Sequence, residues 1–133
     1  MQLTTKFAAS ILAVFLSFWQ FIQIAQAADV YPSKPIRLIL GYAPGGVADI
    51  TARLIAQKMS DSMGQQIVVD NRPSAGGIVA AQAVASADPD GYTILHLNYG
   101  NAVSEALFKK LPYDIQKDFE PVSLMGSFDV LML

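Results

Sequence analysis

The sequence contains no cysteine among its 133 residues. This absence excludes disulfide bonds, thiolate metal sites and cysteine nucleophiles, and it excludes a lipoprotein because there is no thiol to acylate. The chain has one histidine, His96, with no second histidine and no clustered carboxylates near it in sequence. Metal and hydrolytic sites are therefore poorly supported, and we predict no catalytic residue, no metal ligand and no cofactor.

Two further absences concern nucleotides and nucleic acids. The formal net charge is −2 and the isoelectric point about 5.1, and no basic run follows residue 27, so the electrostatic footprint of a nucleic-acid-binding protein is missing. The dinucleotide fingerprint Gly-x-Gly-x-x-Gly is also absent, and no Gly-Lys-Ser/Thr marks a phosphate loop. We predict no nucleic-acid partner.

The N-terminus is strongly apolar and accounts for part of the mean hydropathy of +0.37. Lys6 precedes a mostly apolar stretch over residues 7–24, and Ala25-Gln26-Ala27 fits the small-x-small cleavage rule. These features predict a secretory signal peptide over residues 1–27, followed by one small domain over residues 28–133. The alternative is a transmembrane anchor, since the stretch approaches spanning length. The signal is favoured because the triplet leads directly into a polar segment, so we expect export without stable membrane insertion after cleavage.

The stretch from Ile36 to Asp49 organises the rest of the chain. Residues 36–40 predict a buried strand, Gly41 to Gly46 a tight turn, and the spacing from Val47 a helix that ends at Gly64. Unpaired N–H groups at that helix start, beside the carboxyl end of a strand, form a ready site for an anionic group. The alternative is a plain connection in which glycine and proline only make the turn. The apolar face of the helix is expected to carry Ile50, Leu54 and Ile55, continued by Met59 and Met63.

Strands and helices alternate along the remaining sequence, which predicts an α/β fold with a parallel sheet, flanking helices and right-handed crossovers. We expect a buried strand over residues 66–70, a glycine turn over 71–77, a helix over 78–87, a strand over 92–98, a loop over 99–101, a helix over 102–108 and a strand over 119–125. The second helix should present Ile78, Ala81, Val84 and Ala85 on one face. The loops over residues 41–46, 72–77 and 98–101 fall at the carboxyl ends of strands, where such sheets bind ligands. They are poor in catalytic side chains.

The sequence stops within an apolar run over residues 128–133, with no turn, cap or polar tail. An apolar segment exposed at an edge invites aggregation. We interpret the chain as the N-terminal piece of something longer.

Taken together, these residues resemble the Bug family, the extracytoplasmic solute receptors of tripartite tricarboxylate transporters, from Tyr31 to the end of the chain. The matching pieces are, in order, Tyr31-Pro32-Ser33-Lys34-Pro35-Ile36, Pro44-Gly45-Gly46 with Asp49 and Arg53, Gly64, Val68-Val69 with Asn71-Arg72-Pro73, Ala75-Gly76-Gly77, Ala87-Asp88-Pro89-Asp90-Gly91-Tyr92-Thr93, Leu111-Pro112-Tyr113-Asp114, and Asp118-Phe119 with Pro121-Val122. No single piece is diagnostic, but their order and spacing make the match strong.

The resemblance implies a two-lobed periplasmic binding protein that closes on a small carboxylate and delivers it to the membrane components of the transporter. Residues 28–133 would be the N-terminal part of lobe one, truncated near the crossover to lobe two. The family holds its ligand largely through backbone groups and ordered waters, which implies a periplasmic location and this set of ligand-binding residues: Tyr42, Ala43, Pro44, Gly45, Gly46, Asp49, Ala75, Gly76, Gly77 and Asn98. Ser74 stands where the family often has glycine, and Tyr42 lies at a variable position where it would tune which ligand fits.

Several side chains have two interpretations at this stage. Asp49 compensates the helix dipole or contacts the ligand. Arg53 is expected to pair with Asp49 one turn earlier, whereas Arg72 is either a carboxylate clamp or a bridge between loops. His96 is expected to be packed rather than catalytic.

Three functions remain open. The first is a solute-binding receptor, which we favour. The second is an exported α/β enzyme, for which no nucleophile–base pair is present. The third is a truncated product without activity of its own.

Overall fold

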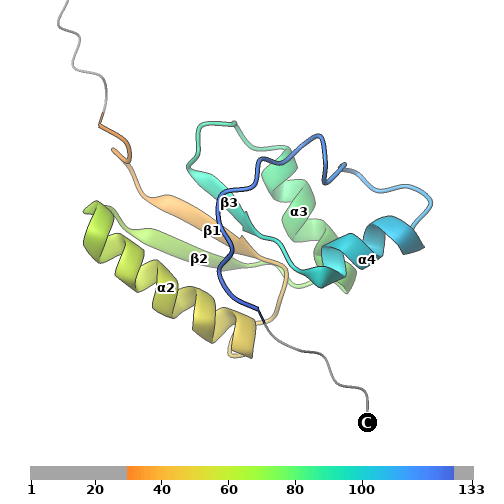
Figure 1. Cartoon of the computed structure of the whole chain (residues 1–133), viewed down its shortest axis with the longest axis horizontal. Helices are drawn as coiled ribbons and strands as arrows, with labels where there is room; N and C mark the ends of the chain where they lie inside the picture. The colour runs from red at the N-terminus through yellow and green to blue at the C-terminus, as the bar shows by residue number, and fades with distance from the viewer. Residues whose placement is uncertain (1–29, 128–133) are drawn as a thin grey trace, which may run out of the picture. The chain divides into compact units, whose positions relative to one another are not determined.

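The computed structural model describes residues 30–127 (Figure 1). The elements in chain order are β1 (Ile36–Leu40), α2 (Val47–Met63), β2 (Ile67–Asn71), the short 3₁₀ helix η2 (Ala75–Gly77), α3 (Ile78–Ala85), β3 (Thr93–His96) and α4 (Tyr99–Leu107).

The three strands form one parallel sheet in the order β2-β1-β3. Leu38 at the centre of β1 lies opposite Val69 of β2 and Ile94 of β3. Parallel neighbours require long crossover connections, and α2 and α3 supply them. The predicted α/β class with a parallel sheet and flanking helices is confirmed.

Helices lie on both faces of the sheet (Figure 1). On one face, Ile36, Leu38 and Leu40 form a buried cluster with Ala52 and Ala56 of α2. Ile39 is fully buried and, by strand alternation, faces the other side, where α3 contacts β1 and β3. Burial on both faces explains why β1 is an almost continuous apolar run.

The buried face of α2 differs from the one that the apolar pattern predicts. Asp49, Ala52 and Ala56 face the protein, whereas Ile50 and Leu54 are 54% and 62% exposed. Alanines let the helix backbone approach the strands closely, and Asp49 tolerates burial because its oxygens are hydrogen-bonded. The prediction that the larger side chains mark the contact face is wrong for Ile50 and Leu54, whereas Met63 packs against the core cluster as expected.

The C-terminus of α2 is as predicted. Gly64 adopts the left-handed conformation with φ 68°, and its N–H donates to the carbonyl of Ser60 at 3.0 Å. Helix α3 ends two residues earlier than expected. Ala81 is buried as predicted, but Ala80 is buried beside it, whereas Ile78, Val84 and Ala85 are only half-buried.

Three predictions about strands and loops are wrong. Strand β2 is displaced by one residue and is an edge strand in the described sheet, with Val68 41% exposed, so it is not buried on both faces. Strand β3 is shorter than predicted, and residues 99–101 form the first turn of α4 instead of a loop. Asn98 starts that helix early, because its side chain accepts a hydrogen bond from the N–H of Gly100.

The fourth predicted strand, over residues 119–125, is extended but pairs with no strand among the described residues. It crosses one face of the sheet, where Met125 packs against the core cluster (Figure 1). Tyr113 is buried against Phe119 in an edge-to-face pair with ring centroids 6.0 Å apart. The apolar run over residues 128–133 lies outside the described residues, as does the predicted signal peptide.

Candidate functional site

Three chain segments meet at the carboxyl edge of the sheet through glycine backbone. We call residues 41–46 the first loop and residues 72–77 the second loop; the third segment is the N-terminus of α4. A Cβ built on Gly41 would lie 2.7 Å from the Cα of Gly77, so the two loops touch backbone to backbone. A Cβ on Gly76 would lie 1.9 Å from Oγ of Ser104, which joins the second loop to α4. These two contacts bring the three segments that were predicted to bind the ligand together at one edge of the sheet.

The first loop presents fewer free donors than the sequence suggested. Pro44 has no N–H, and the N–H of Gly45 donates to Oδ2 of Asp49 at 2.9 Å. The first helical hydrogen bond of α2 runs from Ile50 to the carbonyl of Gly46. The N–H groups of residues 46–49, those of Val47 and Ala48 among them, therefore have no acceptor within the helix, and such groups are the donors that a helix start offers to an anion.

Asp49 is buried beneath the first loop, with 3% of the residue exposed. Nε of Arg53 donates to both carboxylate oxygens at 3.0 Å, which confirms the expected pairing one turn apart. Hydrogen bonds from Arg53, from the N–H of Gly45 and from Asn71 lower the pKa of Asp49 to about 2. The carboxylate is thus ionised and occupied by the protein's own donors.

Asn71, at the end of β2, completes this network. Its Nδ2 donates to Oδ1 of Asp49 at 2.9 Å and to the backbone carbonyl of Tyr42 at 3.1 Å. Its Oδ1 accepts from Nη2 of Arg53 at 2.9 Å. The sequence analysis used Asn71 only as part of a family motif and did not place it at the site.

The second loop is held by a different asparagine. Asn101 is 1% exposed, and its Nδ2 donates to the carbonyl of Gly76 at 3.1 Å. Both Gly76 and Gly77 have positive φ, at 61° and 70°. Ser74 accepts from the N–H of Val79 at 3.0 Å, which joins the loop to α3. Asn101 was missed, although its spacing from Asn98 is that of a capping box.

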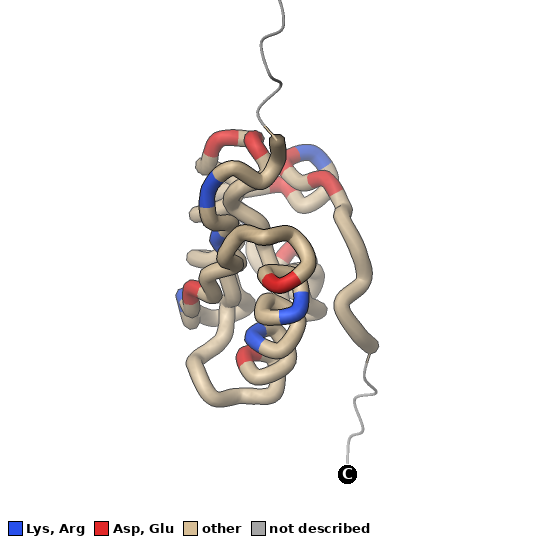
Figure 2. The backbone as a smooth tube through the Cα atoms, turned by 90° about the vertical axis from the view of Figure 1, so that its left-hand side faces the viewer, with Lys and Arg blue, Asp and Glu red and all other residues tan. Residues whose placement is uncertain are grey.

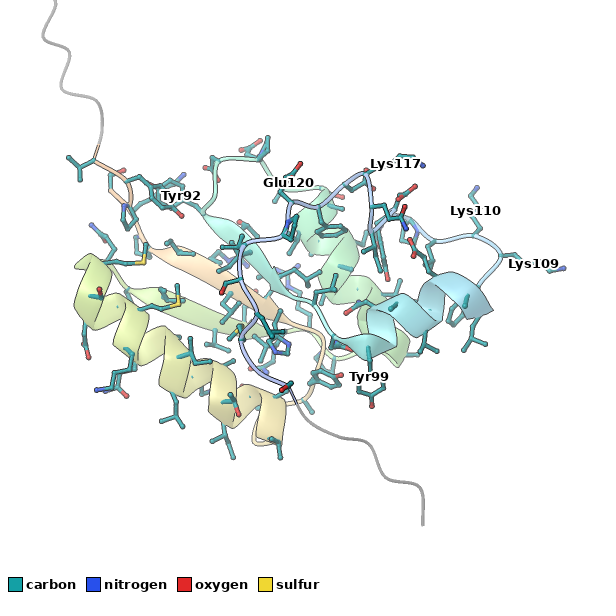
Figure 3. All side chains as sticks on the ribbon, in the orientation of Figure 1. Tyr92, Tyr99, Lys109, Lys110, Lys117 and Glu120 are labelled. Atoms are coloured by element: carbon teal, nitrogen blue, oxygen red, sulfur yellow. The ribbon has the colours of Figure 1, made fainter. Side chains whose placement is uncertain are left out.

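The remaining predicted residues lie at the same edge. Asn98 uses its side chain to cap α4 at 2.7 Å from the N–H of Gly100. Tyr42 is half-buried. Burial, which is the larger cause, and the nearby Tyr99 side chain both raise the pKa of Tyr42. Tyr99 is 60% exposed and points away from the sheet at the start of α4 (Figure 3). Ala43 and Ala75 are exposed.

The other charged and titratable candidates are engaged or half-buried. Arg72 pairs with Asp70 at 3.2 Å. His96 is half-buried, burial lowers its pKa, and its Nδ1 has no hydrogen-bond partner in the described part of the chain. Within residues 30–127, no three His, Asp or Glu side chains are arranged to hold a metal ion. Acidic and basic residues are interspersed along the described part of the backbone (Figure 2).

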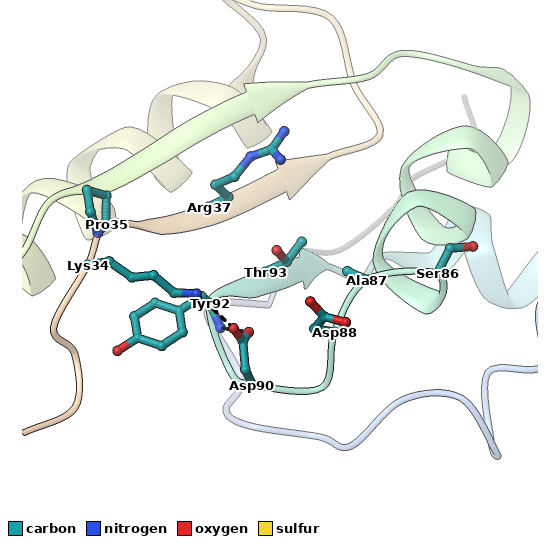
Figure 4. A pocket seen from close by; sticks show the side chains of 9 residues that line it. All are labelled: Lys34, Pro35, Arg37, Ser86, Ala87, Asp88, Asp90, Tyr92 and Thr93. Atoms are coloured by element: carbon teal, nitrogen blue, oxygen red, sulfur yellow. Dashed lines mark hydrogen bonds and ion pairs between the residues drawn. The ribbon is translucent and has the colours of Figure 1, made fainter. Parts of the chain in front are cut away.

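A depression lies at the opposite end of the sheet, near the amino ends of β1 and β3 (Figure 4). Its two cations already have carboxylate partners, because Lys34 pairs with Asp90 at 3.0 Å and Arg37 pairs with Asp70 at 2.7 Å. Ligands of parallel α/β sheets bind at the carboxyl ends of the strands. We therefore place the candidate site at the glycine loops and not in this depression.

The parallel sheet with its flanking helices is shared with periplasmic binding proteins of known structure. MatC from Rhodopseudomonas palustris, solved with bound malate, is 41% identical with a TM-score of 0.67, over 71% of this chain and 33% of that one. A second structure, described as a periplasmic transporter, is 49% identical with a TM-score of 0.61, over 63% of this chain and 29% of that one. The described fold is thus part of a two-lobed periplasmic binding protein fold.

The family follows from the sequence comparison. Residues 51–133 match the family described as the tripartite tricarboxylate transporter family receptor, and the chain belongs to that family. A UPF0065 protein of Bordetella bronchiseptica is 47% identical over 100 residues, which cover 74% of this chain and 30% of the relative. Protein BugT of Bordetella pertussis is 38% identical over 109 residues, covering 80% and 33%. The chain spans about a third of the length of these curated relatives.

Proposed function

We propose that this chain belongs to a periplasmic receptor that captures a small carboxylate for a tripartite tricarboxylate transporter. The chain would contribute the part of the binding site that lies on one of the receptor's two lobes. The observation that carries the proposal is membership of the receptor family, whose model matches residues 51–133. The malate bound to MatC, a relative 41% identical to this chain, supports a carboxylate as the ligand class.

The site chemistry agrees with binding rather than catalysis. The N–H groups of Val47 and Ala48 lie at the positive end of α2, where a carboxylate is stabilised by the helix dipole and by unpaired donors. Asp49 does not oppose the ligand's charge, because Arg53 pairs with it at 3.0 Å. The exposed residues Ala43 and Gly46 of the first loop and Ala75 of the second loop supply further backbone polar groups around this position.

The remaining parts of the proposal concern the whole receptor. Residues 1–27 would be the export signal, and residues 28–133 the N-terminal part of lobe one. A second lobe would close over the ligand, and the membrane components of the transporter would receive it. Within the described part of the chain, no helix is both long enough and apolar enough to cross a membrane.

The test is a nuclear magnetic resonance titration of the ¹⁵N-labelled chain with L-malate and with citrate, up to tens of millimolar. We expect shifts that grow with concentration at the amides of Val47, Ala48 and the second loop, and none with erythritol. Sodium chloride at matched ionic strength controls for salt. Shifts that are equal in sodium chloride, or that cluster around Lys34 and Asp90, would refute the assignment.

A further inference from the structure

Asn71 connects the end of β2 to the first loop, and every polar atom of its side chain is used. Its Nδ2 donates to the carbonyl of Tyr42 and to Oδ1 of Asp49, at 3.1 and 2.9 Å. Its Oδ1 accepts from Nη2 of Arg53 at 2.9 Å. No other described side chain donates to a backbone carbonyl of the first loop.

We propose that Asn71 is a positioning residue that aims the N–H of Ala43 toward the ligand by fixing the Tyr42–Ala43 peptide. This inference rests on the proposed carboxylate-binding function. A trans peptide holds its C=O and N–H on opposite sides. Since Asn71 draws the carbonyl of Tyr42 toward β2, the N–H of Ala43 points away from β2. No hydrogen bond joins that N–H to another residue in the described range.

The same side chain secures the rest of the first loop through Asp49. Asp49 needs both its oxygens in place, one for Asn71 at 2.9 Å and the other for the N–H of Gly45 at 2.9 Å. Gly45 has φ of 84°, which glycine adopts without strain but also leaves readily, and the loop around it is exposed, so the hydrogen bond to Asp49 is what holds this amide in place. Asn71 thus fixes the loop at two points, the Tyr42 carbonyl directly and the Gly45 amide through Asp49.

Asparagine is the side chain that satisfies all three partners at once. An aspartate at this position keeps the acceptor for Arg53, but it has no N–H to donate and places a second carboxylate beside Asp49. An alanine leaves the Tyr42 carbonyl and one oxygen of Asp49 without their partner. The two variants Asn71→Asp and Asn71→Ala therefore remove the positioning contacts in different ways.

The experiment measures amide hydrogen exchange and L-malate titration on the ¹⁵N-labelled full chain. The variants are Asn71→Asp, Asn71→Ala and a double variant, Asp49→Asn with Asn71→Asp, in which the two side chains are swapped between the positions. The matched control is Gln66→Ala, which removes an exposed amide side chain at the other end of β2. Exchange at Gly45 is normalised to exchange at Leu38 in the core strand, so that a general loss of stability does not count as loop release.

We expect normalised exchange at Gly45 to rise roughly tenfold in Asn71→Asp and Asn71→Ala and to stay unchanged in Gln66→Ala. The malate-induced shift at Ala43 should weaken in parallel. The double variant with swapped side chains restores a hydrogen bond between positions 49 and 71 but not the hydrogen bond to the carbonyl of Tyr42. It should therefore recover protection at Gly45 without recovering the malate response at Ala43.

A purely structural role gives a different result. In that case the Asn71 variants lower the melting temperature while normalised exchange at Gly45 and the malate shift at Ala43 stay at wild-type values, which overturns the proposal. If the wild-type chain shows no malate or citrate response at all, the proposed function fails, and the exchange at Gly45 still decides whether Asn71 holds the loop.

Discussion

Oγ of Ser104 occupies the space in which a side chain on Gly76 would have to lie, since a Cβ built there comes within 1.9 Å of it. Gly76 also has φ of 61°. We expect Gly76→Ala to lower the free energy of unfolding by about 2–4 kcal/mol, from overpacking together with left-handed strain. Urea denaturation measures this loss.

The second variant separates the two causes. Ser104→Ala in the Gly76→Ala background removes the hydroxyl and leaves a Cβ contact of 3.2 Å. About half of the lost stability should return, and the strain at φ 61° should remain. A Gly76→Ala protein as stable as wild type would show that the second loop does not pack on α4 in this way.

The pKa of Asp49 predicts part of the acid sensitivity of the fold. Its pKa in the folded chain is about 2, below the ordinary value of 3.8. The unfolded chain therefore binds the proton more readily as pH falls, so the contribution of Asp49 is complete above about pH 4 and is lost toward pH 2. We expect Asp49→Asn to be less stable than wild type at neutral pH, with the difference shrinking between pH 4 and 2. Denaturation curves across this range measure it, and a constant difference would contradict the assignment.

Gly46→Val should reduce ligand binding more than stability. A Cβ at Gly46 meets only the carbonyl of Ala43, at an ordinary contact distance of 3.9 Å, and Gly46 is exposed, so we expect the protein to accommodate the larger side chain beside the proposed site. In a full-length receptor we expect affinity for the cognate carboxylate to fall on the order of tenfold or more, equivalent to about 1.4 kcal/mol. The helix start should lose no more than about 1 kcal/mol.

Gly126→Val is the matched control for this substitution, since it adds the same side chain where no atom lies within 4 Å. Calorimetric titration of both variants separates steric exclusion at the site from a general effect of valine. Unchanged affinity in Gly46→Val would remove the first loop from the site.

The chain by itself should bind carboxylates weakly. One lobe offers a few solvated hydrogen bonds worth roughly 0.5–1.5 kcal/mol each, whereas immobilising the ligand costs at least about 4 kcal/mol. These terms nearly cancel, so we expect millimolar binding or weaker, on the order of −4 kcal/mol at best. Micromolar binding of malate to a monodisperse monomer would show that closure of a second lobe is not required.

Export can be tested independently of binding. The triplet Ala25-Gln26-Ala27 predicts that the mature protein begins at Ala28. N-terminal sequencing of the periplasmic fraction checks this prediction, and intact Met1 in that fraction would contradict it.

The sequence predicts correctly those helices and strands whose local boundary signals agree with their packing in the fold. Strand β1 and helix α2 were predicted to the residue, because an apolar run, a proline–glycine turn and a C-terminal glycine all mark the same boundaries. The contact face of α2 was not predicted, because the pattern of large apolar residues ignores how closely Ala52 and Ala56 approach the sheet. The strand predicted over residues 119–125 was wrong, because β propensity does not say whether a partner strand is available.

The site was predicted at the level of segments but not of contacts. Which loops meet follows from the rule for carboxyl ends of parallel strands. The roles of Asn71 and Asn101 depend on contacts between residues distant in sequence, at separations of 29 and 25 residues from their loop carbonyls. No local pattern records such pairs, whereas the Asp49–Arg53 pair is visible from its helical spacing.

The pairing of Asp49 with Arg53, at 3.0 Å, also bears on how fast a ligand is captured. The two charges sum to zero, so the pair adds no net charge to the first loop and its dipole field falls off steeply, while the dipole at the start of α2 acts only within its first turn. A carboxylate would therefore reach the loop by ordinary diffusion rather than by long-range attraction. We expect its association rate to change little with ionic strength, so that uptake would proceed similarly in dilute and in salt-rich surroundings.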